Sequence, residues 1–341
     1  MHSSLTLEES AKLSGVSRST VSRVVNDQPN VREEVRIRVW EVIQETGYEP
    51  HAAARSLATR RSRIISVIIP ESVTILFTEP FFGLLLSGVT SACNTKRYNL
   101  MLSLFNDPAG EEEMYQRVMR SGYVDGAIVA STRFDDPLIP KLMQDEIPFV
   151  SAGRHPDERV SYVDIDNVTA AHMAVEHLIH LGHLRIGTIT GPLNMASGRD
   201  RLEGYRQALE QHRIPADDSL IVEGDYTEGS GRVCMQRLLP ASPTAVFAAS
   251  DSMAVGAMKV MRAVGVRIPH DVALVGFDDV RVATAVDPAL TTVRQPIERL
   301  GSMAADLLLN RLEDPRDENA PAHRVVLSAD LIVRDSCGAL Q

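Results

Sequence analysis

Four polar side chains near the start of the chain lie on one face of a short segment. Arg18, Ser19, Ser22 and Arg23 occupy the outward positions of a helix predicted over 18–25. Guanidinium and hydroxyl groups on such a face have the reach and hydrogen-bonding capacity to meet base edges and phosphates in the major groove of DNA. The segment therefore has the chemistry expected of a nucleic-acid recognition helix.

Local signals place that helix within a larger motif. Thr6 and Glu9 have the S/T-x-x-E spacing of a capping box, which predicts a first helix from Leu7 that ends at Gly15. Ser17 is placed to cap the second helix. Two short helices joined by a turn of three to four residues that contains glycine form a helix-turn-helix.

A third helix is predicted over about 32–46, with Gly47 as its stop. The apolar side chains available to hold the three helices together are Ala11, Val16, Val21, Val24, Val35, Val39, Val42 and Ile43. The alternative for residues 5–48 is a small helical bundle without a nucleic-acid role, because the same fold also serves in protein contacts.

Charge is distributed unevenly along the chain. The net charge is −10, yet residues 1–63 hold ten Lys/Arg and eight Asp/Glu, while the remaining 278 residues hold 25 Lys/Arg and 37 Asp/Glu. Because an acidic body repels phosphate, contact with nucleic acid is expected only at the N-terminal end.

From residue 64 onward, short apolar runs alternate with amphipathic stretches. The predicted strands are 64–69, 100–104, 127–130, 148–151, 185–190, 220–223, 245–248 and 272–276. The predicted helices are 81–97, 111–121, 136–145, 168–181, 198–212, 227–238 and 251–264. This alternation predicts two doubly wound parallel sheets. Because such sheets bind ligands at the carboxyl ends of their strands, two that face each other form a cleft.

Composition narrows the class of protein. The chain has 341 residues, 44% of them hydrophobic, which is enough for two or three packing units and excludes a disordered or collagenous protein. Three widely spaced cysteines support neither a disulfide framework nor a cysteine metal site. No signal peptide or membrane-spanning run is apparent, so a cytoplasmic location and no membrane partner are expected.

Two groups of potential metal ligands have simpler explanations. A helical i, i+3 pair of histidines could hold a metal, but no HExxH motif is present and the helix is expected to lie at the surface. The histidines are His172, His177, His180 and His183. Residues 164–167 (DIDN) resemble half of a calcium loop without its glycine and distant glutamate, so a turn or helix cap is expected. With no catalytic motif either, the sequence predicts no metal, no cofactor and no enzyme.

Several motifs together resemble the LacI/GalR family of bacterial transcriptional regulators. They are Leu5-Thr6-Leu7, the run AKLSGVSRSTVSRVVN over 11–26, Gly47-Tyr48-Glu49-Pro50 and Ala54-Arg55-Ser56-Leu57-Ala58. The resemblance continues to about residue 336. It implies an all-α helix-turn-helix headpiece followed by an α/β periplasmic-binding-protein-like core of two doubly wound parallel-sheet subdomains.

The resemblance also implies domain boundaries. A headpiece is expected over 1–50, a hinge helix and linker over 51–62, and an effector-binding and dimerisation core over 63–341. Within the core, an N-subdomain is expected over about 63–163 and 294–322, and a C-subdomain over about 164–293 and 323–336.

In the headpiece, Arg18 and Ser19 are expected to discriminate bases, and Arg23 is expected to contact phosphate. The full set expected at DNA is Thr6, Ser17, Arg18, Ser19, Thr20, Ser22, Arg23, Asn26, Arg55 and Leu57. In the family, paired hinge helices enter the minor groove and each wedges a leucine into a base step, and Leu57 matches that position. So short a helix is marginal in water and should order only on DNA. The alternative is that Leu57 packs against a neighbouring domain.

Seven residues are expected at the effector. In the family an aromatic residue at the position of Phe82 lies against the effector, while Arg201 and Asp278 match its forked donor and its carboxylate. The full set is Phe82, Ser197, Arg201, Tyr226, Ser250, Asp278 and Gln295. The alternatives are a core role for Phe82 and a structural ion pair for Arg201. Segment 71–79 is longer than the connection usual in the family, so the resemblance does not fix the position of Phe82 relative to the effector.

The resemblance implies a regulator that represses transcription from a pseudo-palindromic operator in double-stranded DNA as a homodimer, under control of a sugar or sugar derivative. Ser250 and Ala130 stand where family members often have asparagine, so the effector should be held differently from that of lactose-type regulators. Only eight residues follow Val333, so no tetramer through a C-terminal heptad helix is expected. The alternative function is a sugar receptor for transport, which the absent signal peptide and the helix-turn-helix disfavour.

Overall fold

The computed structural model describes residues 6–25, 30–46, 61–70, 73–105, 107–130, 133–313 and 321–339, and the chain divides into two compact units, 1–63 and 64–341. Three residues expected at DNA, Asn26, Arg55 and Leu57, lie outside the described residues. Among the helices within the described ranges, none is both long and apolar enough to span a membrane.

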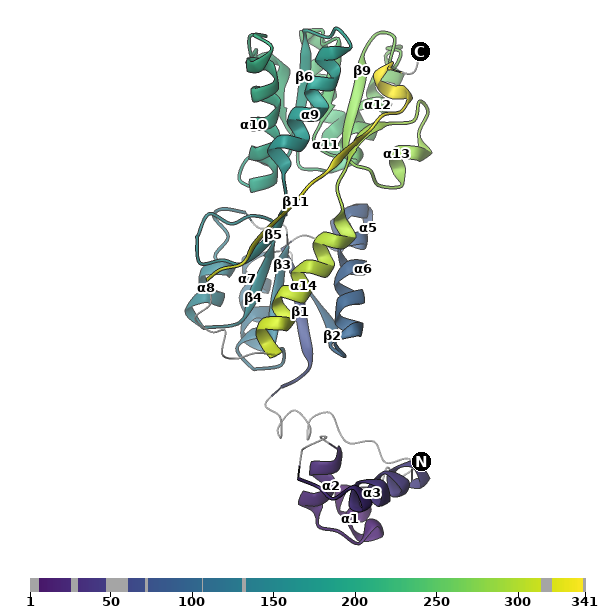
Figure 1. Cartoon of the computed structure of the whole chain (residues 1–341). Coiled ribbons are helices and arrows are strands. Elements are labelled where there is room, and N and C mark those ends of the chain that lie inside the picture. Colours follow the sequence, from purple (N-terminus) through teal and green to yellow (C-terminus); the bar gives the residue numbers. More distant parts are fainter. Residues whose placement is uncertain are drawn as a thin grey trace. The chain divides into compact units, whose positions relative to one another are not determined.

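The first unit contains three helices, α1 (Leu7–Ser14), α2 (Arg18–Val25) and α3 (Glu33–Thr46) (Figure 1). The predicted capping box is present, because the Thr6 backbone N–H donates to Glu9 Oε2 at 2.7 Å and the Glu9 N–H donates to Thr6 Oγ1 at 3.3 Å. Gly15 ends α1 in the left-handed region, with φ 64°. The buried core is Ala11, Val21, Val24, Val39 and Ile43. The predicted helix-turn-helix and its apolar core are confirmed.

The second unit is built on two six-stranded sheets. The first has the order β11-β5-β4-β3-β1-β2, all parallel, and the second has the order β12-β10-β9-β8-β6-β7, in which only β12 is antiparallel. The first sheet comprises β1 (Ile64–Ile69), β2 (Asn99–Leu104), β3 (Gly126–Ala130), β4 (Phe149–Ala152), β5 (Tyr162–Ile165) and β11 (Arg324–Leu327). The second comprises β6 (Ile186–Thr190), β7 (Ile221–Glu223), β8 (Ala245–Ala248), β9 (Ala273–Asp278), β10 (Thr291–Arg294) and β12 (Asp330–Ile332).

Helices cover both sheets. They are α5 (Val73–Thr78), α6 (Pro80–Thr95), α7 (Pro108–Met114), α8 (Leu138–Gln144), α9 (Asn167–His180), α10 (Ala196–Gln211), α11 (Glu228–Leu238), α12 (Asp251–Ala263), α13 (Val282–Ala285) and α14 (Ile297–Glu313). A π-helical turn (Tyr115–Met119) follows α7, and short 3-10 turns lie at Asp218–Leu220, Leu239–Ala241 and Asp335–Cys337. The predicted alternation of strands and helices is confirmed.

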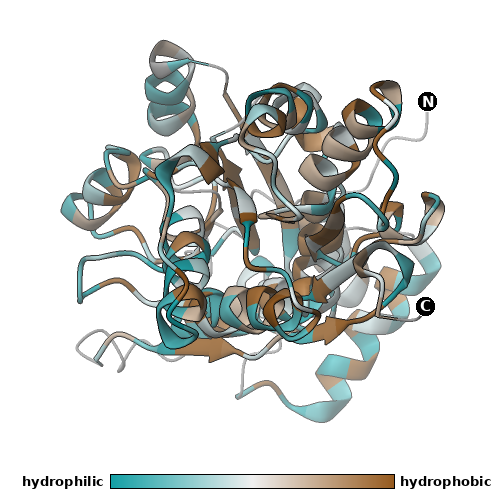
Figure 2. Ribbon diagram, turned by 90° about the horizontal axis from the view of Figure 1, so that it is seen from above, coloured by the Kyte–Doolittle hydropathy of each residue, from teal (hydrophilic) through white to brown (hydrophobic). Residues whose placement is uncertain are grey.

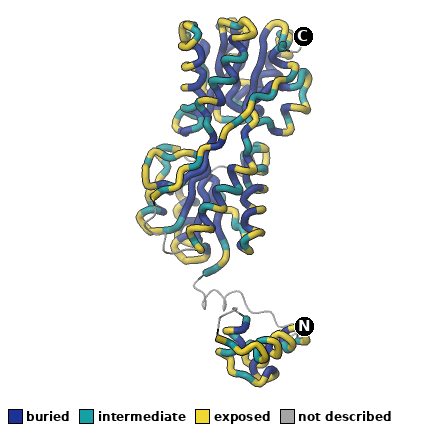
Figure 3. The backbone as a smooth tube through the Cα atoms, viewed as in Figure 1, coloured by how far each residue is buried: buried dark blue, intermediate teal, exposed yellow. Residues whose placement is uncertain are grey.

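The central strands form the cores of the two subdomains. Strands β3, β4, β6 and β8 are buried along their whole length, as expected for parallel strands covered on both faces. The strands inside both subdomains are dark blue in Figure 3, and Figure 2 shows brown strands in the interior with teal on the outer helices. The sheets therefore provide rigid platforms, and the loops at their carboxyl ends are free to carry chemistry.

Glycines allow two helix pairs to approach closely. A Cβ on Gly88 of α6 would lie 1.9 Å from the carbonyl oxygen of Glu298 in α14, and one on Gly204 of α10 would lie 2.2 Å from that of Val168 in α9. Only glycine fits at such contacts. The α9 and α10 pair is important for the site, because both helices begin at the carboxyl edge of the sheets.

The structure differs from the sequence-based expectations in several places. The sequence analysis did not predict strands β5, β10, β11 and β12 or helix α14. Strand β11 pairs with β5, so residues 324–327 belong to the first subdomain and not to the second; in Figure 1 the yellow C-terminal segment runs from one sheet to the other. The helix expected over 111–121 begins at Pro108 and becomes π-helical at Tyr115. Part of the long segment 71–79 forms the helix α5.

Candidate functional site

The outward face of the headpiece presents the predicted polar residues. Ser17, Arg18, Ser19 and Arg23 are exposed. Ser17 Oγ lies 2.8 Å from Ser19 Oγ and 2.8 Å from the hydroxyl of Thr20, and it accepts a hydrogen bond from the Thr20 N–H as the cap of α2. These hydroxyls are thus held together at the N-terminal end of α2, where backbone N–H groups favour anions such as phosphate.

Arg18 makes one ion pair within the headpiece. Its Nη1 lies 3.2 Å from Glu8 Oε1, with both side chains 68% exposed. So exposed a pair contributes little to stability. DNA can therefore replace Glu8 at low cost, and Arg18 can turn toward a base edge.

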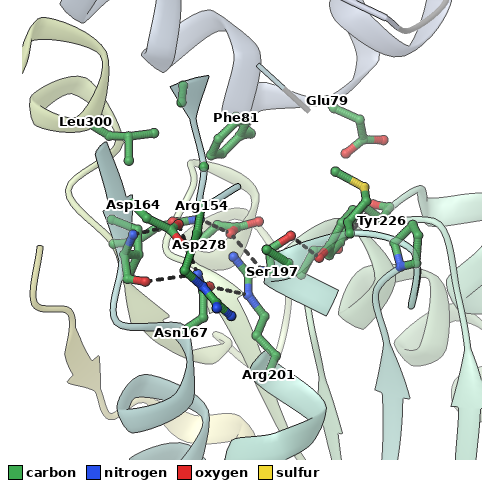
Figure 4. Close-up of a pocket in the computed structure, with 18 of the residues that line it drawn as sticks. Glu79, Phe81, Arg154, Asp164, Asn167, Ser197, Arg201, Tyr226, Asp278 and Leu300 are labelled. Atoms are coloured by element: carbon green, nitrogen blue, oxygen red, sulfur yellow. Dashed lines mark hydrogen bonds and ion pairs between the residues drawn. The ribbon is translucent and has the colours of Figure 1, made fainter. Parts of the chain in front are cut away.

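A cavity of about 250 Å³ lies between the two subdomains of the second unit. All seven residues predicted at the effector, from Phe82 to Gln295, line it. Figure 4 labels Ser197, Arg201, Tyr226 and Asp278 among them. The structure thus brings together residues from six separate stretches of the chain, and their contact with an effector stays a prediction. Other residues of the lining include Ile75, Glu79, Phe81, Arg133, Arg154, Asp164, Asn167, Asp225 and Leu300.

Arg201 is the central donor of the cavity. It lies on α10 and is buried, with Nε donating to Asn167 Oδ1 at 2.9 Å and Nη1 donating to the Ala249 carbonyl at 2.5 Å. Its guanidinium stacks on the Phe277 ring, with Cζ 3.7 Å from the ring centroid. Two bonds and a stacking contact fix the plane of the guanidinium, so its other N–H groups have defined directions.

Asp278 is the central acceptor. It ends β9, and its Oδ1 accepts from Gln295 Nε2 at 2.5 Å. Burial raises the pKa of Asp278 to about 7, and Arg201 and Gln295 counteract the shift only in part. Behind it, burial and the neighbouring Asp278 charge raise the pKa of Asp251, which accepts bonds from the Thr292 hydroxyl at 2.6 Å and the Val280 N–H at 2.9 Å. Two buried carboxyl groups, Asp278 in the cavity lining and Asp251 behind it, thus influence each other's charge.

The backbone is strained at two lining residues. Asp278 has φ 116° and Tyr226 has φ 71°, both in the region that favours glycine. Such strain concentrates at binding sites, where the surrounding structure enforces it. The Tyr226 hydroxyl lies 2.8 Å from Ser197 Oγ, and its ring lies so close to Gly191 that a Cβ there would be 2.2 Å from ring atoms. Tyr226 and Ser197 therefore form a fixed polar edge on one aromatic wall.

The opposite wall comes from the first subdomain. Phe82 is only 6% exposed and belongs to the core cluster, and it also lines the cavity. It therefore has a core role, while its contact with the effector stays a prediction. Its neighbour Phe81 packs edge to face against it, with ring centroids 5.5 Å apart, and extends the apolar wall (Figure 4). Glu79 precedes α6, and burial raises its pKa.

The Ser250 hydroxyl forms two hydrogen bonds within the protein. Its hydroxyl accepts from the Met253 N–H at 3.2 Å as the cap of α12 and donates to the Tyr226 carbonyl at 3.1 Å. Its bonds therefore hold the Tyr226 loop as much as they serve the cavity. Ala130 is 1% exposed at the end of β3 and does not line the cavity.

The sequence analysis did not predict several residues that line the cavity. Arg154, after β4, pairs with Asp200 of α10 at 2.5 Å, and burial raises the pKa of Asp164 at the end of β5 to about 6. Asn167 is the first residue of α9 and accepts the bond from Arg201. All three lie at or just after the carboxyl ends of strands, and the rule that ligands bind at those ends could have found them.

The four histidines do not converge on one point. His172 contacts Gln211, His177 contacts Cys337 and His183 contacts Thr244, whereas the ring of His180 lies beside that of His212. Helix α9 carries His172, His177 and His180. Only one side of this helix lies at the surface, because seven of its residues are buried. The expected cap at residues 164–167 is confirmed, since Asp166 accepts from the Thr169 N–H at 3.1 Å.

Comparison with known proteins identifies relatives over nearly the whole chain. The sequence profile "Bacterial regulatory proteins, lacI family" matches residues 6–51, and "Periplasmic binding protein-like domain" matches 175–337. The chain is 41% identical over 336 residues to the HTH-type transcriptional regulator CelR of Thermobifida fusca, covering 97% of this chain and 98% of that one. It is 37% identical over 319 residues to the HTH-type transcriptional repressor PurR of Escherichia coli, covering 92% of each.

Solved structures give the same result. A complex of the transcriptional regulator CelR with cellobiose is similar with a TM-score of 0.78 and 39% identity, covering 97% of this chain and 99% of that chain. The lac repressor dimer bound to operator and the anti-inducer ONPF is similar with a TM-score of 0.84 and 26% identity, covering 98% and 99%. The named relatives are transcriptional regulators and not enzymes.

Proposed function

The chain belongs to the lacI family of bacterial regulatory proteins, and from that premise we propose that it represses transcription until a sugar occupies the cavity around Arg201 and Asp278. It is a DNA-binding transcriptional regulator under effector control. Members of the family bind DNA operators and sugar effectors. The identity of the sugar, the form of the operator, the assembly and the cytoplasmic location belong to the proposal.

One observation carries the choice of effector. Arg201 and Asp278 put a forked donor and a carboxylate side by side in a buried cavity, between the aromatic walls of Phe81 and Tyr226. A sugar has hydroxyl groups that both donate and accept, and an apolar C–H face that packs on aromatic rings. The aromatic walls and the Arg201–Asp278 pair together suit a polyol ring.

A β-linked glucose disaccharide is the first candidate sugar. The relative solved with cellobiose is 39% identical to this chain over nearly its whole length. The lining of the cavity also includes Glu79, Asp225 and Arg133, whose polar groups can serve a second ring. A flat base is the competing ligand class, since an aromatic wall suits it as well.

We propose that two copies of the chain read a pseudo-palindromic operator. Symmetry of the site follows from symmetry of a dimer, and each headpiece offers one recognition helix, α2. Effector binding between the subdomains changes operator affinity by its differential affinity for the two arrangements of the core. A coupling of about 1–3 kcal/mol corresponds to a change of roughly 5- to 150-fold.

The test begins without a known operator. Full-length protein selects duplexes from a random library, and the enriched sequences are then titrated by fluorescence anisotropy with and without cellobiose, glucose and a purine base. The proposal expects a two-fold symmetric sequence and weaker binding with the disaccharide. Enrichment of no sequence would contradict the repressor function, whereas a response to the base alone would contradict the sugar.

A further inference from the structure

We propose that Glu176, His180 and His212 form a binding site for a transition-metal ion such as Zn²⁺ on the second subdomain, remote from the effector cavity. Their ligand atoms all lie within 4.8 Å of one another. The three side chains come from two elements, since Glu176 and His180 are one turn apart on α9 and His212 directly follows α10. One carboxylate oxygen and two imidazole nitrogens are the donor set of many zinc centres.

The distances fit such an ion. Glu176 Oε1 and His212 Nε2 lie 3.4 Å apart. Two ligands of a tetrahedral zinc with bonds of about 2.0–2.1 Å lie about 3.3 Å apart, so this edge of the site is already in place. The His180 ring lies 5.5 Å from the His212 ring, centroid to centroid, at an interplanar angle of 84°. Because His180 is exposed at the last position of α9, a small side-chain rotation brings its nitrogen to the ion.

Neighbouring groups orient the carboxylate. Gln211 Nε2 donates to Glu176 Oε1 at 3.2 Å, and Gln211 Oε1 lies 2.9 Å from His172 Nε2. Partners of this kind hold metal ligands in position in known centres. His172 thus supports the site from outside, although its ring belongs to no ligand pair.

Helix geometry favours a cation at this point. His180 is the final residue of α9, and His212 is the C-cap of α10. Both helices begin at the effector cavity, with Asn167 in α9 and Arg201 in α10, and both end at the proposed metal site. Two helix C-termini therefore direct their partial negative charges toward the ion, which adds to the charge of Glu176. A bound ion would also fasten together the two helices that hold the cavity residues.

The sequence analysis set the histidines aside because no HExxH motif is present and their helix was expected to lie at the surface. The third ligand, His212, is 32 positions beyond His180 and joins it only because α10 packs on α9 through Gly204.

The experiment uses tag-free full-length protein stripped with chelator. Isothermal titration with ZnCl₂ and the visible absorption of bound Co²⁺ are compared for wild type, a His180→Asn/His212→Asn double variant and His270→Asn, an exposed histidine elsewhere in the same unit. We expect one more bound ion in wild type and His270→Asn than in the double variant, tetrahedral Co²⁺ bands that the double variant lacks, and no response to Mg²⁺, which prefers oxygen ligands.

A single Glu176→Gln variant serves if the double variant fails to fold, and it should lower Zn²⁺ affinity at least about tenfold. Equal stoichiometry and affinity in wild type and the ligand variants would overturn the proposal. So would octahedral Co²⁺ spectra that the variants leave unchanged.

Discussion

The Nη1 of Arg201 and the Oδ1 of Asp278 lie 3.7 Å apart at the floor of the cavity, in side chains that are 6% and 11% exposed. This distance is too long for a direct hydrogen bond. The two opposite charges are thus close together without a direct hydrogen bond between them. A ligand hydroxyl can accept from the guanidinium and donate to the carboxylate at once, so the pair is arranged to bind a third group.

Arg201→Ala should remove the effector response and preserve operator binding, because it removes the forked donor from the cavity and leaves the headpiece intact. Truncating one partner of a buried charge pair costs about 2–5 kcal/mol, which is roughly 30-fold or more in Kd for the effector. Arg201→Lys keeps the charge without the fork and should also bind the effector poorly. Titration calorimetry checks this, with Arg206→Ala on the exposed side of α10 as the control. Normal induction in both Arg201 variants would refute the cavity assignment.

Asp278→Asn should flatten the pH dependence of stability. Burial raises the pKa of Asp278 from about 4 to about 7, so the folded core holds its proton more tightly than the unfolded chain. The stability that comes with this proton is complete below about pH 4 and is lost as pH rises through about 7. Thermal unfolding without effector should therefore show a larger fall of the midpoint between pH 5 and 8 in wild type than in the variant. Curves that stay parallel to that of wild type, as expected for the exposed control Asp330→Asn, would count against it.

Leu57→Ala should weaken operator binding and leave effector binding unchanged. If the leucine wedges into a base step, its loss removes the contact that compensates for unstacking, a few kcal/mol per step. Anisotropy with the selected operator measures the first effect, and calorimetry with the effector measures the second. Leu184→Ala, at a leucine that is 68% exposed in the second unit, is the control. Unchanged operator affinity in Leu57→Ala would eliminate the hinge role.

Two headpiece arginines should differ in their effects. Arg18→Ala should relax sequence preference at one position of each half-site and cost about 1–3 kcal/mol, because a base contact is lost. Arg23→Ala should weaken binding to all sequences and lower the salt slope of log K by about 1, because a phosphate contact is lost. Binding to matched and mutated operators over a salt series distinguishes the two. Identical specificity profiles for both variants would disprove the division of roles.

Gly88→Ala should destabilise the second unit, because the added Cβ would lie 1.9 Å from the Glu298 carbonyl and force α6 away from α14. Overpacking of this kind costs about 1–3 kcal/mol. Gly83→Ala on the same helix meets nothing within 4 Å and should be neutral or stabilising by about 0.5–1 kcal/mol. Chemical denaturation compares the two. Equal stability of both variants would mean that the helices separate at no cost.

Much of the fold could be predicted from local patterns. The capping box at Thr6, the stop at Gly15 and the buried valines of α2 depend on residues at most a few positions apart. The alternation of apolar runs and amphipathic stretches likewise predicted the parallel sheets. Local patterns failed where packing decides. The sequence analysis assigned residues 323–336 to the second subdomain, and only the pairing of β11 with β5 places residues 324–327 in the first.

The site was predictable where the family resemblance marks a position, and not elsewhere. Phe82, Arg201, Asp278 and the other four predicted residues all line the cavity. Glu79, Arg154, Asp164 and Asn167 line it too, although the family resemblance marked none of them as an effector-binding residue. The elevated pKa of Asp278 also follows from burial, which a sequence does not display.

The sequence by itself determined the helix-turn-helix and the alternation of strands and helices over most of the core, because these depend on side chains close together along the chain. Only the tertiary structure decided that Arg201 stops 3.7 Å short of Asp278, and that His212 joins His180 at the ends of two helices. Both results arise from packing between segments more than 30 positions apart, and such packing depends on the whole set of contacts at once.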